Sequence, residues 1–371
     1  MKLRVVLVLG HNLGWRTYAR TLVDALERRD DVDVVVVGGG QAAGGGGRGR
    51  ATAPRHREAT RLVRDLRMVP SLRRTVRAHR PHLVHAAGHL MARPLRWSGP
   101  TPTLSLLLDG TARQSDVAKG ATGGIGRLAW HDERRLFARA QLINCVSSWA
   151  ASSVVDDYQI PADRVRVRPY PIADVAPDLA ERVGSRPRRS GRSAGRPQLL
   201  FVGGDFERKG GPFLLEAFAR HWADRAELDV VSDTAPRTGL PPGVRVHPGV
   251  DNQRVRDEFF PAADLLVHPT RFDQSSMVAI EAAAFSLPAV VTDVGGVGEV
   301  VADGETGFVT DDDASFVAAV DDLVADGDRR RLMGAAARRR FLDVHEADSS
   351  TERLVADWCW AVDQSGSASG P

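Results

Sequence analysis

Short apolar runs alternate with amphipathic stretches from the first residues of the chain. Leu3–Leu9 and the run "VDVVVV" at 32–37 are continuous apolar segments, which is typical of parallel strands buried on both faces. Between them, "WRTYARTLVDALERR" carries apolar residues at helical spacing. This order predicts a strand, a helix and a parallel strand at the start of the chain.

The alternation continues, stops near residue 181 and starts again after Pro197. Residues 181–197, "ERVGSRPRRSGRSAGRP", are nearly free of apolar side chains and have the composition of a linker. Further strands are predicted at 82–88, 101–110, 141–147, 198–204, 226–232, 243–250, 264–270 and 288–293. Helices are predicted at 56–81 with a break at Pro70, 126–140, 212–222, 276–286 and 351–362.

This pattern predicts two doubly wound α/β domains that face each other across a ligand-binding cleft. The first domain is expected at 1–180, the linker at 181–197 and the second domain at 198–340. A helical segment at 341–363 is expected to pack back on the first domain, and 364–371 are expected to form a disordered tail.

Composition narrows the class of protein. Hydrophobic residues make up 43% and charged residues 26% of the 371 residues, as in folded globular domains. The two distant cysteines, Cys145 and Cys359, suggest neither a disulfide framework nor a cysteine zinc site, and they favour a cytoplasmic location. The first apolar run is too short for a signal peptide or a membrane span.

Two common nucleotide-binding motifs do not occur. The first strand is followed by "GHNLGW", in which Gly10 and Gly14 lack the spacing of a dinucleotide-binding loop, and there is no P-loop sequence. Gly14 either permits a ligand to approach a helix N-terminus closely or serves only a tight turn.

The stretch "LLFVGGDFERKGGPFLLEAF" places two cations before a predicted helix. Pro212 marks the helix start, so Arg208 and Lys209 lie where the helix dipole is already positive. A bound phosphate group would turn this unfavourable placement into a favourable one. The alternative is a solvated turn in which Glu207 neutralises one of the cations.

The stretch "RFDQSSMVAIEAAAF" supplies carboxylates. Ser275 or Ser276 is the expected N-cap, which places the amides of Met277 and Val278 in the first helical turn as a second anion-binding terminus. Glu281 lies one turn further along, where it either holds a ligand hydroxyl or pairs with a core arginine. Asp273 remains in the preceding loop.

These two stretches carry a family resemblance. "FVGGDFERKGG", followed by "ADLLVHPTRFDQSSMVAIEAAAFSLPAVVTDVGGVGEVVADGETGFV", resembles the C-terminal domain of the family 4 glycosyltransferases, most strongly from Gln198 to Arg340. The resemblance implies a GT-B fold of two Rossmann-like domains, with the acceptor on the first and a nucleotide sugar on the second. It also implies hexosyl transfer with retention, usually without a metal or other cofactor, in polysaccharide or glycolipid biosynthesis.

The resemblance assigns roles to particular residues. Glu281 matches the glutamate that holds the donor ribose, and Asp273 matches the one that contacts the transferred sugar. Arg208 and Lys209 match the pair that binds the diphosphate, which Gly14 is expected to face. The chain departs from the family where Asp273 replaces a longer glutamate, where Ser276 replaces a glycine and where Gly204 replaces an arginine.

Three further polar residues follow predicted strands of the first domain. Asp109 stands where the family often has a histidine near the acceptor, and it either serves the acceptor or forms a turn. His85 and His89 face the expected cleft, although a core or loop role explains them more simply.

The segment from Arg48 to Arg80 is strongly basic. It contains eleven arginines against two acidic residues, with apolar residues interleaved: Arg48, Arg50, Arg55, Arg57, Arg61, Arg64, Arg67, Arg73, Arg74, Arg77 and Arg80. It is either a peripheral contact with the inner, anionic membrane face or a solvated helix surface. Nucleic acid is not expected, because the segment has no aromatic residue for stacking.

The sequence therefore predicts a glycosyltransferase with a nucleotide-sugar donor and an unidentified acceptor. Two alternatives stay open: a non-catalytic member of the fold that binds a sugar or a protein, and a sugar-nucleotide epimerase.

Overall fold

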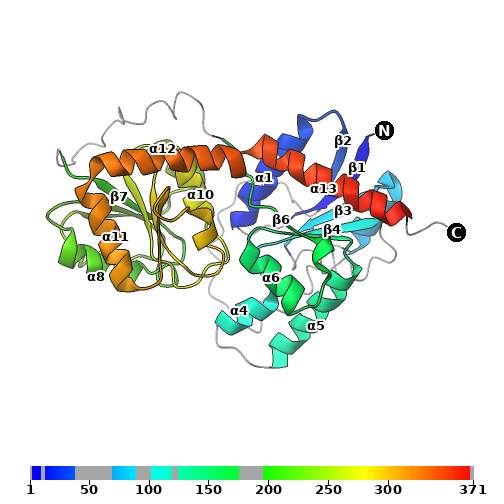
Figure 1. Cartoon of the computed structure of the whole chain (residues 1–371), viewed down its shortest axis with the longest axis horizontal. Coiled ribbons are helices and arrows are strands. Elements are labelled where there is room, and N and C mark those ends of the chain that lie inside the picture. Colours follow the sequence, from blue (N-terminus) through cyan, green and yellow to red (C-terminus); the bar gives the residue numbers. More distant parts are fainter. Residues whose placement is uncertain are drawn as a thin grey trace. The chain divides into compact units, whose positions relative to one another are not determined.

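The protein has two compact units, each with a six-stranded sheet. The computed structural model describes residues 2–9, 13–37, 69–88, 102–118, 124–174 and 195–367 (Figure 1). The first unit comprises Met1–Pro171 and Ser350–Pro371, and the second comprises Ile172–Ser349. All strand pairs in both sheets are parallel, so the predicted pair of doubly wound α/β units is confirmed.

The first sheet has the strand order β2-β1-β3-β4-β5-β6. Its strands are β1 Leu3–Val8, β2 Val32–Val37, β3 Leu83–Ala87, β4 Thr103–Leu108, β5 Leu142–Cys145 and β6 Val165–Val167. The helices are α1 Leu13–Glu27, a helix over 69–79, α4 Ala112–Ala118, α5 Gly124–Arg139, α6 Ser148–Asp156 and a 3₁₀ turn at Ala162–Arg164. Residues 69–79 are helical in the described part, and the predicted break at Pro70 lies at the edge of that part, next to residues that are not described.

The C-terminal helix α13, Ala347–Ser367, supplies side chains to the core of the first unit. The Trp358 indole N–H donates to His85 Nδ1 at 3.2 Å, and Asp357 accepts from the Asn144 amide at 3.1 Å. Arg168 forms an ion pair with the same Asp357. His85 is therefore a core histidine in β3, while His89 lies outside the described residues.

The predicted tail is wrong over 364–367, because α13 continues to Ser367. Thr103 Oγ1 donates to Ser365 Oγ at 3.0 Å, which fixes this last turn to β4. The predicted boundary at residue 340 falls inside α12, Gly327–Val344. The helix continues because Asp326 caps its start and no glycine or proline interrupts its last turns.

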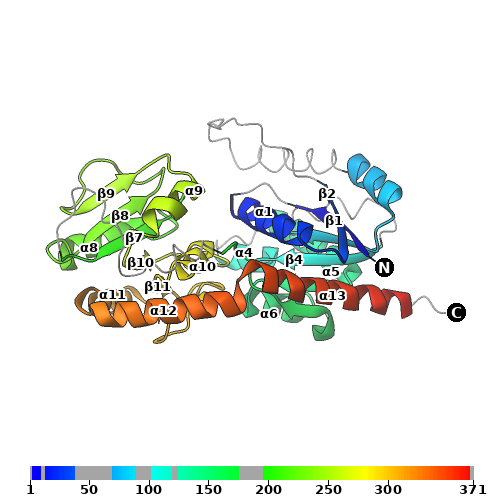
Figure 2. The ribbon, with the colours of Figure 1, turned by 90° about the horizontal axis from the view of Figure 1, so that it is seen from above.

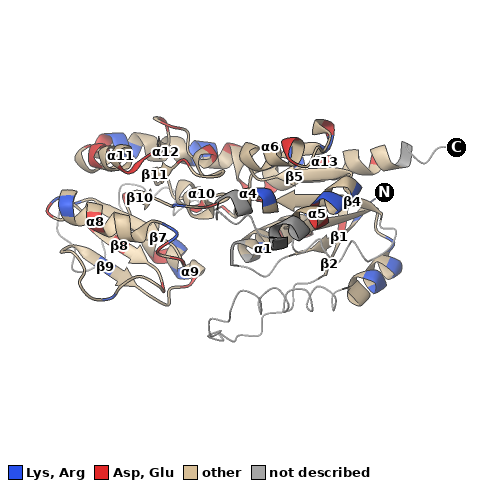
Figure 3. Ribbon diagram, turned by 90° about the horizontal axis from the view of Figure 1, so that it is seen from below, with Lys and Arg blue, Asp and Glu red and all other residues tan. Residues whose placement is uncertain are grey.

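The basic segment is described only from residue 69 onward. There, Val69 and Leu72 are buried and Val76 packs on the core, while Arg73, Arg74 and Arg77 are exposed. The helix over 69–79 is light blue in Figure 2 and carries blue Lys or Arg positions in Figure 3. The apolar side of the helix over 69–79 is thus used by its own domain. The peripheral membrane contact through the basic segment stays a prediction that these residues do not test, and 48–68 lie outside the described part.

The second sheet has the strand order β12-β11-β10-β7-β8-β9. Figure 2 shows β10, β7, β8 and β9 side by side in this order. Its strands are β7 Gln198–Val202, β8 Glu227–Val231, β9 Val244–His247, β10 Leu265–His268, β11 Ala289–Thr292 and β12 Gly307–Thr310. The helices are α8 Gly211–His221, α9 Asn252–Arg254 with a π turn Val255–Phe259, α10 Met277–Ala284, a 3₁₀ turn Gly298–Val300, α11 Asp313–Ala325 and α12. The predicted linker at 181–197 lies largely outside the described residues.

One face of the second sheet packs against a hydrophobic core. Leu199, Phe201 and Val230 point into a core that α8 and α11 close with Leu214, Phe218 and other apolar residues. The helix α10 contacts β10, β11 and α12. Because all strands are parallel, the loops before α8 and α10 both emerge at the carboxyl edge of this sheet, where α/β folds bind ligands.

Candidate functional site

Two loops of the second unit meet at the carboxyl edge of its sheet. The loop after β7 carries Arg208 and Lys209 directly before α8, as predicted. The loop after β10 joins it through backbone and side-chain bonds: the Arg271 amide donates to the Arg208 carbonyl at 2.9 Å, and the Arg208 guanidinium donates to the Phe272 carbonyl at 2.6 Å. The two loops therefore form one charged surface.

A left-handed glycine permits this approach. Gly210 has φ of +77° and is the N-cap of α8. A Cβ atom at this position would lie 1.8 Å from the Pro269 carbonyl oxygen, at the end of β10. Only glycine fits here, and it holds Lys209 against the second loop.

Asp273 is the acid that meets these cations. The Lys209 ammonium donates to Asp273 Oδ2, and Arg208 Nη1 lies 3.9 Å from Oδ1. The Lys209 and Asp273 side chains are only 13% and 18% exposed, so the pair is shielded from water. Burial alone would raise the pKa of Asp273, but the adjacent His268 ring and the Lys209 ammonium more than offset it and hold this pKa at about 2. Burial lowers the pKa of Lys209, and Asp273 opposes that effect.

His268 lies beneath this pair and was not singled out from the sequence. It ends β10, is fully buried, and neither ring nitrogen has a hydrogen-bond partner among the described residues. Its Nε2 is 3.7 Å from Asp273 Oδ2, longer than a hydrogen bond. Burial, and secondly the Lys209 charge, lower the pKa of His268 from 6.5 to about 4.

Replacing His268 with leucine is expected to flatten the pH dependence of stability between pH 6.5 and 4. In the native protein, His268 stays neutral while the unfolded chain takes up a proton as pH falls through 6.5, so stability is lost over this window, by about 3 kcal/mol at most. The leucine variant lacks this contribution. Apparent melting temperatures from pH 7 to 4.5 measure it.

The control for this prediction is His131→Leu, which alters an exposed histidine on α5. Its melting temperatures should follow the wild-type slope. Equal slopes for the wild type and His268→Leu would contradict the prediction.

The helix α10 presents its N-terminus beside Asp273. Ser276 is the N-cap, and its hydroxyl accepts from the Ala279 amide at 3.3 Å, so Met277 and Val278 form the first turn as predicted. Ser276 is only 1% exposed. Its hydroxyl is thus turned into the helix, where it caps the backbone.

Glu281 lies one turn further along α10 and is buried. Its Oε1 accepts from the Asn252 amide at 3.2 Å and from Arg256 Nη1 at 3.3 Å. The pairing of Glu281 with an arginine, one of the two alternatives from the sequence, is therefore present. Asn252 and Arg256 were missed because they belong to a short turn without amphipathic spacing.

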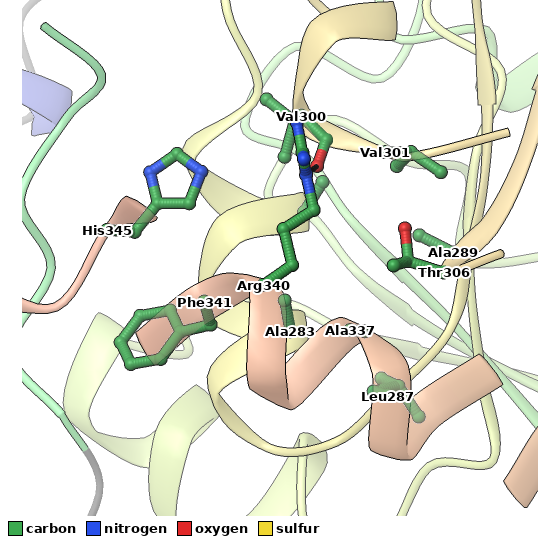
Figure 4. Close-up of a pocket in the computed structure, with 11 residues that line it drawn as sticks. Ala283, Leu287, Ala289, Val300, Val301, Thr306, Ala337, Arg340, Phe341 and His345 are labelled. Atoms are coloured by element: carbon green, nitrogen blue, oxygen red, sulfur yellow. Dashed lines mark hydrogen bonds between the residues drawn. The ribbon is translucent and has the colours of Figure 1, made fainter. Parts of the chain in front are cut away.

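A small pocket lies on the other side of α10 (Figure 4). It lies beside Ala279 and Ala283, with Thr306, Arg340 and His345 as its polar lining residues. Ala279 and Ala283 each lie two positions from Glu281, which places them on the opposite helix face. The pocket is therefore separate from the charged surface.

The first-unit candidates are placed within their own sheet. Gly14 lies in the first turn of α1, and Asp109 follows the carboxyl end of β4. Beyond Asp109, Thr111 Oγ1 and Ser153 Oγ share a hydrogen bond of 2.8 Å. Both candidates thus stand at the edge where strand-to-helix loops emerge.

Within the described ranges, no group of three or more His, Cys, Asp or Glu side chains is arranged to hold a metal ion. None of the helices described is long and apolar enough to cross a membrane.

Both units match known protein families. Residues 14–174 match the model for Glycosyltransferase Family 4, and residues 196–326 match that for Glycosyl transferases group 1. The chain is 30% identical over 301 residues to D-inositol 3-phosphate glycosyltransferase of Geodermatophilus obscurus, covering 74% of this chain and 64% of that protein. It is 31% identical to alpha-maltose-1-phosphate synthase of Mycolicibacterium smegmatis, over 62% of this chain and 66% of that protein. The chain thus spans just under two thirds of these relatives.

Solved structures share the fold. Sucrose-phosphate synthase from Thermosynechococcus elongatus superposes with a TM-score of 0.75 at 16% identity, over all of both chains. HepE from Anabaena, in complex with UDP, gives a TM-score of 0.68 at 14% identity, over 96% of this chain and 99% of that one.

Proposed function

Because the chain belongs to the group 1, family 4 glycosyltransferases, we propose that it transfers a sugar from a nucleotide-sugar donor bound by its second unit to an acceptor. The observation that carries this proposal is the charged surface formed by Arg208, Lys209 and the start of α10. Two cations and the free amides of a helix N-terminus suit a diphosphate, and all lie at the ligand-binding edge of the sheet.

Before a donor binds, Asp273 forms an ion pair with the Lys209 ammonium. A diphosphate brings more negative charge than one carboxylate, so it competes for the Lys209 ammonium and for Arg208. Asp273 is then released toward the sugar, the role that the family resemblance gives it. Glu281 takes the ribose hydroxyls, as the same resemblance implies.

In the reaction, the bond between the anomeric carbon and the phosphate oxygen breaks, an acceptor hydroxyl oxygen bonds to the same carbon and loses its proton to the solvent, and the leaving diphosphate gains negative charge. Arg208, Lys209 and the amides of Met277 and Val278 offset that charge, which is the work that a metal ion does in other transferases. We propose transfer of a hexosyl group with retention and without a metal or other cofactor. Asp109 is the proposed acceptor-side residue, and Gly14 the proposed point of close approach.

A donor panel tests the proposed function. The protein is incubated with UDP-, ADP- and GDP-sugars, and released nucleoside diphosphate is measured with and without candidate acceptors. Acceptor-dependent release supports transfer. Tight binding without release favours the non-catalytic alternative, and a change of the sugar without release favours the epimerase, so either outcome would refute the proposal.

Peripheral contact with an anionic membrane at the cytoplasmic face is also proposed. Its support is the exposed row Arg73, Arg74 and Arg77, and because the apolar side of this helix is buried, the contact would be electrostatic. Co-sedimentation with vesicles that contain phosphatidylserine should then be strong at low salt and weak at about 1 M salt. No co-sedimentation at low salt would refute it.

A further inference from the structure

Glu281 accepts two hydrogen bonds from the segment that follows β9. Asn252 and Arg256 both donate to the same oxygen, Oε1, at 3.2 and 3.3 Å. The side chains of Arg256 and Glu281 are only 12% and 7% exposed, so the ion pair is shielded from water. Two donors on one oxygen restrict rotation of the carboxylate, which accepts hydrogen bonds in about four directions.

Arg256 is itself held in place from two other sides. Its guanidinium lies over the Phe285 ring at 5.7 Å, and its Nη2 donates to the Ala173 carbonyl at 2.9 Å. The planar, forked guanidinium reaches Glu281 and Ala173 together, which a lysine ammonium on a single bond cannot reproduce.

The segment around Ala173 is anchored in turn. The Ile172 amide donates to the His345 carbonyl at 2.9 Å, and Asp174 pairs with Arg338. Arg256 therefore connects Glu281 to the point where the chain enters the second unit. This rigid support is what a binding carboxylate needs in order to be preorganised.

We propose that Arg256, assisted by Asn252, is a positioning residue that orients the Glu281 carboxylate toward the ribose hydroxyls of the donor, which rests on the proposed function. Nothing in the spacing of the donor motif assigns such a residue, because Arg256 lies 25 positions before Glu281. A hydrogen bond to a charged group contributes about 1.5–3 kcal/mol. Each ribose hydroxyl should thus add about ten-fold or more in affinity.

The test compares nucleotides with and without those hydroxyls. UDP, ADP and GDP are screened by thermal shift, and the one that stabilises the protein most is titrated beside its 2′,3′-dideoxy form. The wild type is expected to prefer the hydroxylated nucleotide by about 100-fold or more, because the two hydroxyls each add about ten-fold or more. The ratio of the two affinities, hydroxylated over dideoxy, should fall to about three-fold or less in Arg256→Gln. Arg256→Lys should keep only part of the wild-type ratio.

The ratio separates positioning from folding. A purely structural loss would weaken both nucleotides equally and leave the ratio unchanged, which would overturn the inference. Arg254→Gln is the matched control: Arg254 is on the same segment, is 51% exposed and pairs with Glu258, so its ratio should equal the wild type. A lowered ratio in Arg254→Gln would also overturn the inference.

The inference and the proposed function fail differently. If the hydroxyl preference depends on Arg256 but no donor releases its nucleotide, the positioning role stands and transfer is refuted. If transfer occurs but the ratio ignores Arg256, only the positioning role is refuted. If none of the three nucleotides binds, both are overturned.

Discussion

Lys209→Ala is expected to lower the rate of sugar transfer by about 10²–10³-fold, the usual cost of removing one group that stabilises developing charge. Lys209 is the less exposed of the two cations before α8, at 13% against 39% for Arg208. Its charge is therefore the less screened by water. Nucleoside diphosphate release under saturating donor measures the effect, and a melting curve shows that the variant remains folded.

The Arg220→Ala variant is the control, because Arg220 is also on α8 but is 67% exposed and pairs with Glu216 at the surface. Its rate should equal the wild type. The double variant Lys209→Ala, Asp273→Asn addresses another explanation, namely that an unpaired Asp273 causes the loss. Recovery of activity in the double variant, or a Lys209→Ala rate within about three-fold of wild type, would contradict the prediction.

Gly210→Ala is expected to destabilise the second unit by about 2–4 kcal/mol. The left-handed backbone costs an alanine about 1–2 kcal/mol, and the added Cβ would also meet the Pro269 carbonyl at 1.8 Å, so the two loops must separate. A drop of about 5–15 °C in the melting temperature follows for a unit of this size. Separation of the loops should also loosen the Lys209–Asp273 pair and lower activity.

Gly239→Ala separates the two causes. Gly239 has φ of +69°, but no heavy atom of the described residues, apart from Gly239 and its chain neighbours, lies within 4 Å of a Cβ built there. This variant has the backbone cost without the clash, so it should lose less stability than Gly210→Ala. Equal melting temperatures for the two variants would show that the close approach to Pro269 does not contribute to the loss of stability in Gly210→Ala.

Strand and helix positions were largely predictable because continuous apolar runs and helical periodicity mark buried strands and amphipathic helices. The pattern failed where elements are short or irregular. The strand β6 has three residues, and the π turn Val255–Phe259 does not follow the 3.6-residue period. Arg256 lies in that turn, which is why no spacing argument found it.

The pairing of site residues was less predictable than their presence. Lys209 and Asp273 were each recognised, but their ion pair joins positions 64 residues apart. It depends on β7 and β10 being neighbours in the sheet, a choice of strand order that local sequence does not encode. His268 was missed for a related reason, since a residue that ends an apolar strand does not reveal what it packs beneath.

The position of α13 has a consequence for synthesis on the ribosome. His85 and Asn144 belong to the first half of the chain, but their partners Trp358 and Asp357 are translated more than 200 residues later. The second unit, Ile172–Ser349, is complete before those partners emerge. The first unit should therefore finish folding after the second, because the hydrogen bonds of His85 with Trp358 and of Asn144 with Asp357 form only when α13 docks.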